Sequence, residues 1–132
     1  MRLTAHITSS NQTITFPNFI NNKWKKIKLI KAFWNAQNIS TNRCLFFSID
    51  ECDENNFYTA SNNIIKYTAN YFQEEHYSIG ELRLHQQNDN YEWTSFKNER
   101  IDKLTINILN YLGSSATDIN ATNYLLLEFV LE

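Results

Sequence analysis

Apolar residues recur at every second position along much of the chain, and this period limits the fold more than any other feature. In segment 124–131 one face would be wholly apolar and the other mixed: Leu125, Leu127, Phe129 and Leu131 against Tyr124, Leu126, Glu128 and Val130. Successive side chains of a strand point to opposite faces, so this pattern predicts a β-strand. Because its second face is also partly apolar, we expect this strand inside a sheet, paired on both sides.

Five further segments alternate in the same way, namely 13–16, 24–34, 43–50, 91–94 and 103–109, and one more strand is expected over 79–84. The first would bury Ile14 and Phe16 and ends at Pro17. In 24–34 the expected buried face holds Ile27, Leu29 and Phe33, with Lys26 and Lys28 opposite. Leu45, Phe47 and Ile49 share one face of 43–50, and Leu104, Ile106 and Ile108 are expected to point inward in 103–109. Tyr91 and Trp93 alternate with Glu92 and Thr94, and Ile79, Leu82 and Leu84 mark an expected strand near Gly80.

Segment 57–73 fits both a helical and an alternating pattern, but its β-branched and aromatic residues favour a strand with Ile65, Tyr67, Ala69 and Tyr71 on one face. Polar segments 35–41, 51–56, 86–90 and 113–123 are expected to be loops. With only two Gly and one Pro in the chain, asparagine is expected where the backbone is left-handed.

Seven or eight short strands joined by polar loops indicate an all-β fold, an antiparallel β-sandwich with a single jelly roll of about eight strands. The chain has 132 residues, so one domain is expected to cover 1–132. A domain of this size can bury enough surface to fold without disulfides. The 42% hydrophobic content is typical of a globular protein rather than a disordered one.

Motifs for catalysis or metal binding are not found, so we assign no catalytic, cofactor-binding or metal-binding residue and expect no enzyme. Cys44 and Cys52 lack a metal-ligand spacing and are interpreted as a small apolar residue and a bystander thiol, which favours a reducing compartment. His6, His76 and His85 are scattered along the chain. A nucleophile elbow, a glycine-rich phosphate loop and a Cys–His signature are all missing from the sequence.

Charged residues gather in two places. The acidic run 50–54 offers calcium ligands but lacks the spaced Asp/Asn–Gly pattern of a calcium loop, so a solvated turn is favoured. A basic run with aromatic neighbours comprises Lys23, Lys25, Lys26, Lys28 and Lys31 with Trp24 and Trp34. It is either a nucleic-acid strip or a charged strand face that discourages edge pairing, and the net charge of -2 favours the second. We therefore expect no direct nucleic-acid partner, and no segment is apolar enough for a membrane span.

Tyrosines supply a further signal, because a sandwich of this length cannot easily bury all nineteen aromatic residues. Interface tyrosines are expected among Tyr58, Tyr67, Tyr71, Tyr77 and Tyr91. The alternative is that these residues form partly exposed cross-strand pairs.

Four stretches together resemble a known group of proteins, namely 13–17, 24–31, 104–109 with its following loop, and the terminal 124–132. Their order and the Leu-Leu-Leu-Glu-Phe ending are similar to penton and other minor capsid proteins of icosahedral double-stranded DNA viruses of the adenovirus, tectivirus, virophage and polinton type. The resemblance implies a single jelly roll without catalytic residues, cofactor or small-molecule substrate. It also implies a homopentamer at each fivefold vertex that contacts the major capsid protein.

Such a protein would be made in the cytoplasm or nucleus of the host cell and reside in the virion. The chain departs from this group in having no long basic N-terminal arm and no extra domain, so receptor attachment is not expected. Two other classes stay open. One is a non-catalytic jelly-roll binding module, either a carbohydrate binder using Trp24, Trp34 or Trp93 or a trimeric ligand of the tumour-necrosis-factor type. The other is a small hydrolase, which needs carboxylates that converge in a cleft.

Overall fold

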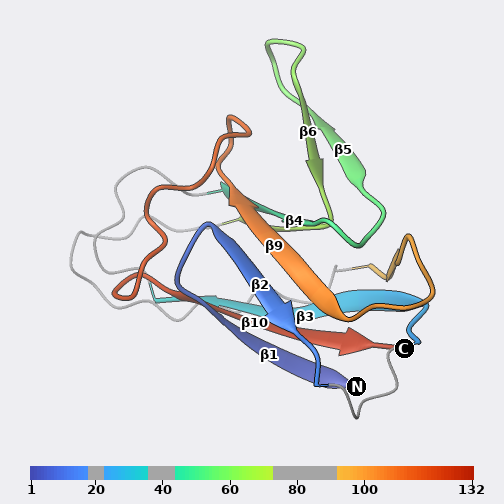
Figure 1. Cartoon of the computed structure of the whole chain (residues 1–132). Coiled ribbons are helices and arrows are strands. Elements are labelled where there is room, and N and C mark those ends of the chain that lie inside the picture. The colour runs from blue at the N-terminus through green and yellow to red at the C-terminus, as the bar shows by residue number, and fades with distance from the viewer. Residues whose placement is uncertain (18–22, 36–43, 73–91) are drawn as a thin grey trace.

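The computed structural model describes residues 1–17, 23–35, 44–72 and 92–132, and within these ranges every regular element is a β-strand (Figure 1). The strands are β1 Arg2–Ile7, β2 Asn11–Thr15, β3 Lys26–Trp34, β4 Cys44–Ile49, β5 Asn55–Tyr58, β6 Ile64–Tyr67, β7 Ala69–Phe72, β8 Thr94–Ser95, β9 Lys103–Leu109 and β10 Leu125–Leu131. The predicted all-β class is confirmed. The expected strand 79–84 and Tyr91 lie outside the described residues.

Eight strands form two four-stranded sheets that pack face to face as a sandwich (Figure 1). Sheet A has the order β1-β10-β3-β8, and sheet B has the order β2-β9-β4-β7. All strand pairings are antiparallel, and β5 and β6 form a separate two-stranded hairpin. The prediction of an antiparallel β-sandwich is therefore confirmed.

Strand β10 lies inside sheet A, between β1 and β3, as its two apolar faces predicted. Leu127 is opposite Ala5 on one side and Ala32 on the other, so two small residues flank a large one. The backbone groups of β10 are thus bonded on both sides, which removes the cost of burying them. The inward row of β10 is the predicted one and is at most 1% exposed: Leu125, Leu127, Phe129 and Leu131.

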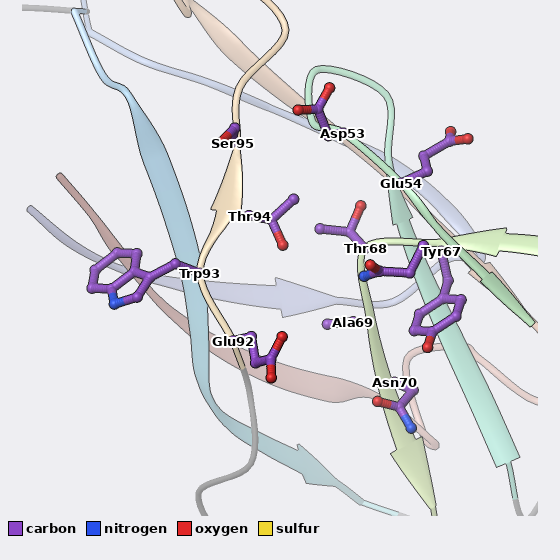
Figure 2. Close-up of a pocket in the computed structure, with 11 residues that line it drawn as sticks. Asp53, Glu54, Tyr67, Thr68, Ala69, Asn70, Glu92, Trp93, Thr94 and Ser95 are labelled. Atoms are coloured by element: carbon purple, nitrogen blue, oxygen red, sulfur yellow. The ribbon is translucent and has the colours of Figure 1, made fainter.

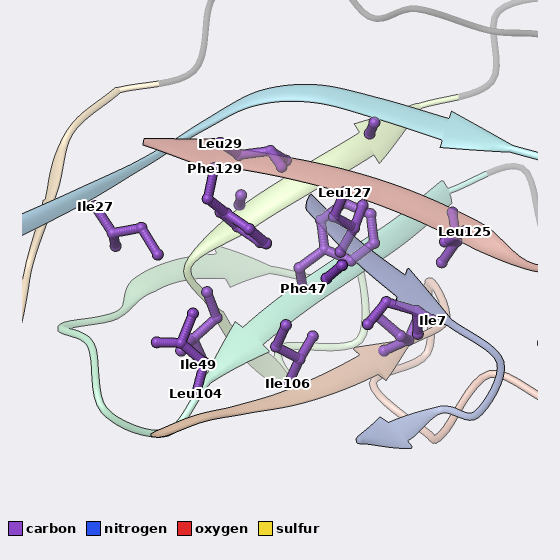
Figure 3. Close-up of a cluster of buried hydrophobic side chains, with 14 of the residues drawn as sticks. Ile7, Ile27, Leu29, Phe47, Ile49, Leu104, Ile106, Leu125, Leu127 and Phe129 are labelled. Carbon is purple, nitrogen blue, oxygen red and sulfur yellow. The ribbon is translucent and has the colours of Figure 1, made fainter. Parts of the chain in front are cut away.

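The core lies between the two sheets (Figure 3). Side chains of β10, among them Leu127 and Phe129, point toward Phe47 and Ile49 of β4 and Ile106 of β9. The predicted inward rows of β4 and β9 are fully buried: Leu45, Phe47, Ile49, Leu104, Ile106 and Ile108. Each such side chain contributes roughly 1.5–3 kcal/mol relative to an exposed one.

Strand β3 contains one extra residue, which corrects the prediction for Phe33. Leu29 pairs with Phe129 and Lys31 pairs with Glu128, so Ile30 has no partner of its own in β10. Such a β-bulge reverses the alternation beyond it. Trp34 is consequently buried, at 1% exposure, and Phe33 is only half-buried on the outer face of sheet A.

The described part of segment 57–73, residues 57–72, forms strands, as predicted, but not a single one. A turn at 59–63 joins β5 to β6, and Thr68 separates β6 from β7. Asn62 in this turn has φ of 65°, as expected for asparagine in a left-handed position. Residues 55 and 56 begin β5, so the predicted loop 51–56 is too long. The expected loop 113–123 contains no strand, whereas 36–41 and 86–90 fall beyond the described parts.

Candidate functional site

A pocket of about 430 Å³ opens at one side of the sandwich, where β8 and β7 are the outermost strands of their sheets (Figure 2). The backbone N–H of Asp53 donates to the carbonyl of Ser95 at 2.8 Å, which holds the turn before β5 against β8. The pocket is lined by Asp53, Glu54, Asn55, Tyr67, Thr68, Ala69, Asn70, Glu92, Trp93, Thr94 and Ser95.

Three carboxylates border this pocket, on two segments of the chain that lie apart in the sequence. Asp53 and Glu54 lie at one end, on the turn before β5, and Glu92 lies at the other end (Figure 2). Glycoside hydrolysis needs two carboxylates that face each other across the scissile bond. Nothing in sequence periodicity singled out Glu92, because the pocket exists only once β7 and β8 are placed side by side. Groups of three or more His, Cys, Asp or Glu suited to a metal ion do not occur in the part of the chain that is described.

The acidic run 50–54 has two structural roles that the sequence did not indicate. Glu51 accepts hydrogen bonds from the backbone N–H and the hydroxyl of Thr105, at 2.7 and 2.9 Å. The carboxylate of Asp50 accepts one from the Asn107 side chain at 2.9 Å. Asp50, Asp53 and Glu54 are exposed, as expected for a solvated turn, whereas Glu51 is half-buried.

Three lysines of the basic run, Lys26, Lys28 and Lys31, lie on β3 and have local partners on the outer face of sheet A, whereas Lys23 and Lys25 precede the strand. Lys26 Nζ lies 4.4 Å from the ring centre of Trp93 and 3.3 Å from Glu132. Lys28 Nζ lies 5.8 Å from the same ring centre. Trp34 is buried in the core, so it cannot stack on a base or a sugar beside these lysines.

Both cysteines are free thiols, and burial keeps them protonated near neutral pH. Burial raises the pKa of Cys44 to about 11. For Cys52 burial is again the main cause, and the negative charges of Glu51 and Asp53 add to it, which raises its pKa to about 12. A protonated, buried thiol is unreactive. This environment agrees with the interpretation of Cys52 as a small apolar residue.

The histidines are not brought together in the described residues. His6 is exposed on β1 and packs edge to face against Tyr124, with ring centres 4.8 Å apart. His76 and His85 lie outside the described residues.

The β5–β6 hairpin packs on the outer face of sheet B through Phe46. This residue lies between the inward residues of β4, so its side chain points out of the sandwich, yet it is only 1% exposed. Its ring centre is 5.0 Å from that of Phe57 and 5.1 Å from that of Tyr67. Phe46 therefore anchors the hairpin, which projects from the body of the sandwich (Figure 1).

Large apolar side chains are exposed around this hairpin. Tyr58 and Ile64 pair across its two strands and are 67% and 51% exposed. Nearby, Gly113 approaches Ile65, and the loop just before it exposes Tyr111 and Leu112 by 51% and 64%.

We call Tyr58, Ile64, Tyr111 and Leu112 the hairpin surface. Tyr58 and Ile64 form an exposed apolar pair, and exposed apolar patches are typical of contact sites. Of the five tyrosines expected at an interface, Tyr58 is exposed and Tyr67 is half-buried against Phe46. The Tyr71 side chain, Tyr77 and Tyr91 fall outside what the structure describes.

Known protein families provide no match to this chain, and no curated protein matches its sequence. A helix long and apolar enough to cross a membrane does not occur among the described residues.

Proposed function

We propose that this chain is a structural capsid protein, the penton, whose five copies close a fivefold vertex of an icosahedral shell. In this function the protein has no substrate or cofactor. Its partners are other copies of itself and the neighbouring major capsid protein, and its place is the virion. The proposal rests on the strand order of the sandwich.

The strand order is that of one long hairpin rolled up, which supports a single jelly roll. Among the eight sandwich strands, the first pairs with the last, the second with the seventh, the third with the sixth, and the fourth with the fifth: β1 with β10, β2 with β9, β3 with β8, and β4 with β7. Rolling this hairpin adds the contacts of β10 with β3 and of β9 with β4. Jelly rolls of this size are typical of viral capsid proteins and of lectins.

The hairpin surface favours a capsid protein over a lectin. A sugar binder displays aromatic rings on an open face. Trp34 is buried and Trp24 is half-buried, and Trp93, which is 38% exposed, has the amino groups of Lys26 and Lys28 over its ring. The exposed apolar residues are instead on a projecting hairpin and a loop tip, where they suit a contact with another protein. In a closed ring each copy offers two different, complementary surfaces to its neighbours.

Native mass spectrometry and negative-stain electron microscopy of the purified chain test this function. Five-membered rings are expected. A three-membered assembly would support a trimeric ligand instead, and a chain that stays monomeric at every concentration would support an isolated binding module. The variant Tyr58→Ser with Ile64→Ser should lose the assembly. The control Thr13→Ser, on the exposed outer face of β2, should keep it.

A further inference from the structure

We propose that the hairpin surface of one copy packs against the outer face of sheet A of the next copy, forming a head-to-tail contact. The inference rests on the proposed ring and names its interface. Three features carry it: the division of charge along the chain, an apolar strip on sheet A, and the positions of the two surfaces on opposite sides of the molecule.

Charge is divided along the sequence. The first 49 residues contain seven Lys and Arg and no Asp or Glu, whereas the remaining residues contain five basic and fourteen acidic ones. The fold turns this division into a spatial one, because β1 and β3 both belong to sheet A. Arg2, Lys28 and Lys31 consequently lie on its outer face together with Glu128, which contacts Arg2 at 3.1 Å and Lys31 at 4.0 Å.

The outer face of sheet A also carries a strip of half-buried apolar residues. Leu126 of β10 is opposite Phe33 of β3, and Val130 is opposite Lys28. Tyr124 continues the strip, with its ring centre 6.4 Å from that of Phe33. Phe33 belongs to this strip because the bulge at Ile30 turns it outward. The result is an apolar band with basic residues beside it.

The hairpin combines exposed apolar residues with acidic residues, which complement the apolar and basic residues of the strip. Tyr58 and Ile64 face away from Phe46 at the turn end of the hairpin, and the exposed acids Asp53 and Glu54 lie at its other end, where the N–H of Asp53 donates to Ser95 of β8. Lys66 shares the outer side of the hairpin, so the acids exceed it by one. An acidic, apolar surface therefore matches a basic, apolar one.

Tyr58 and Ile64 lie on the opposite side of the sandwich from the strip, because the hairpin packs on sheet B and the strip is on sheet A (Figure 1). Asp53 and Glu54 lie between these two sides, in the turn bonded to β8. A twofold dimer through the hairpin would bring Asp53 and Glu54 of both copies together. A head-to-tail contact instead places acids against bases and leaves a free hairpin and a free strip at its ends. Such contacts repeat until a ring closes.

Charge-reversal variants test the contact in sedimentation velocity. The acid variant is Asp53→Lys with Glu54→Lys, and the base variant is Lys28→Glu with Lys31→Glu. Each alone should associate at least about tenfold more weakly than the wild type, because like charges then meet. A mixture of the two should associate again, since each hairpin then finds an opposite charge on the other variant. The chain with all four changes should regain its association.

The control Lys97→Glu with Lys103→Glu changes the net charge as much as the base variant does, at two exposed residues away from the strip, and should leave association unchanged. Urea unfolding of every variant checks that the fold is kept. If the wild type forms five-membered rings but the mixture of variants does not associate, the proposed interface is wrong and the penton function is still supported. If the mixture and the fourfold variant recover but no ring of five forms, the interface stands and the penton function falls. A monomeric wild type at all concentrations overturns both.

Discussion

Two neighbouring leucines of β10 give the sharpest test of the sandwich. Leu127 is 0% exposed and points into the core, whereas Leu126 is half-buried on the outer face. The residue type, the strand and its two neighbouring strands are the same for both. Replacing each by alanine therefore isolates the effect of the face.

The expected costs follow from what each substitution removes. Leu127→Ala deletes three carbon groups, worth about 0.8 kcal/mol each in transfer from water, or about 2.4 kcal/mol. The cavity left between the sheets adds about 1 kcal/mol, so unfolding should become easier by about 3–4 kcal/mol. Leu126→Ala opens no closed cavity and removes a side chain already in partial contact with water, which should cost about 1 kcal/mol.

Urea unfolding followed by tryptophan fluorescence measures both costs, because Trp34 is buried and its emission changes on unfolding. The comparison requires equal dependence on urea for the wild type and both variants. Equal losses of stability, or a larger loss for Leu126→Ala, would contradict the assignment of the two faces of β10.

Three further substitutions test local features, each by urea unfolding. Above pH 9 the unfolded chain loses the Cys52 proton, which the folded chain keeps up to about pH 12, so the stability of the wild type falls as pH rises. The stability of Cys52→Ala should fall less, by about 2–3 kcal/mol at pH 11. Parallel curves of stability against pH for the two proteins would refute this. Glu51→Ala should cost about 2–3 kcal/mol because Thr105 loses two hydrogen bonds to a carboxylate, while the exposed Glu54→Ala should change stability by less than about 0.5 kcal/mol; similar losses would count against the role of Glu51. Gly113→Ala should cost about 1–2 kcal/mol because φ is +84° there, and an unchanged midpoint would show that the turn relaxes.

The buried rows of β9 and β10 were predictable because each strand alternates without interruption and its pairing follows the pattern. In β3 the same reasoning failed at Phe33. The bulge at Ile30 depends on how β3 meets β10, and nothing local to 24–34 marks it. Trp34, counted among the residues of a possible binding strip, is instead part of the core.

The hairpin was only partly predictable. The β-branched and aromatic residues of 57–73 indicated a strand, and the four consecutive residues Ala60, Ser61, Asn62 and Asn63 mark the turn in retrospect. The predicted inward row of Leu45, Phe47 and Ile49 already places Phe46 on the outer face, but the sequence could not reveal that the hairpin covers it. The pocket could not be predicted from the sequence either, because Asp53 and Glu92 line the same pocket only once β8 has taken its place at the edge of sheet A.

The place of β10 between β1 and β3 sets the order in which the protein can be completed. During synthesis the first and third strands emerge more than ninety residues before the strand that joins them. Until then both have an unsatisfied edge and exposed hydrocarbon, and closure spans nearly the whole polypeptide, which makes folding slow. A nascent chain of this kind is vulnerable to aggregation, and it is a natural client for chaperones at the ribosome.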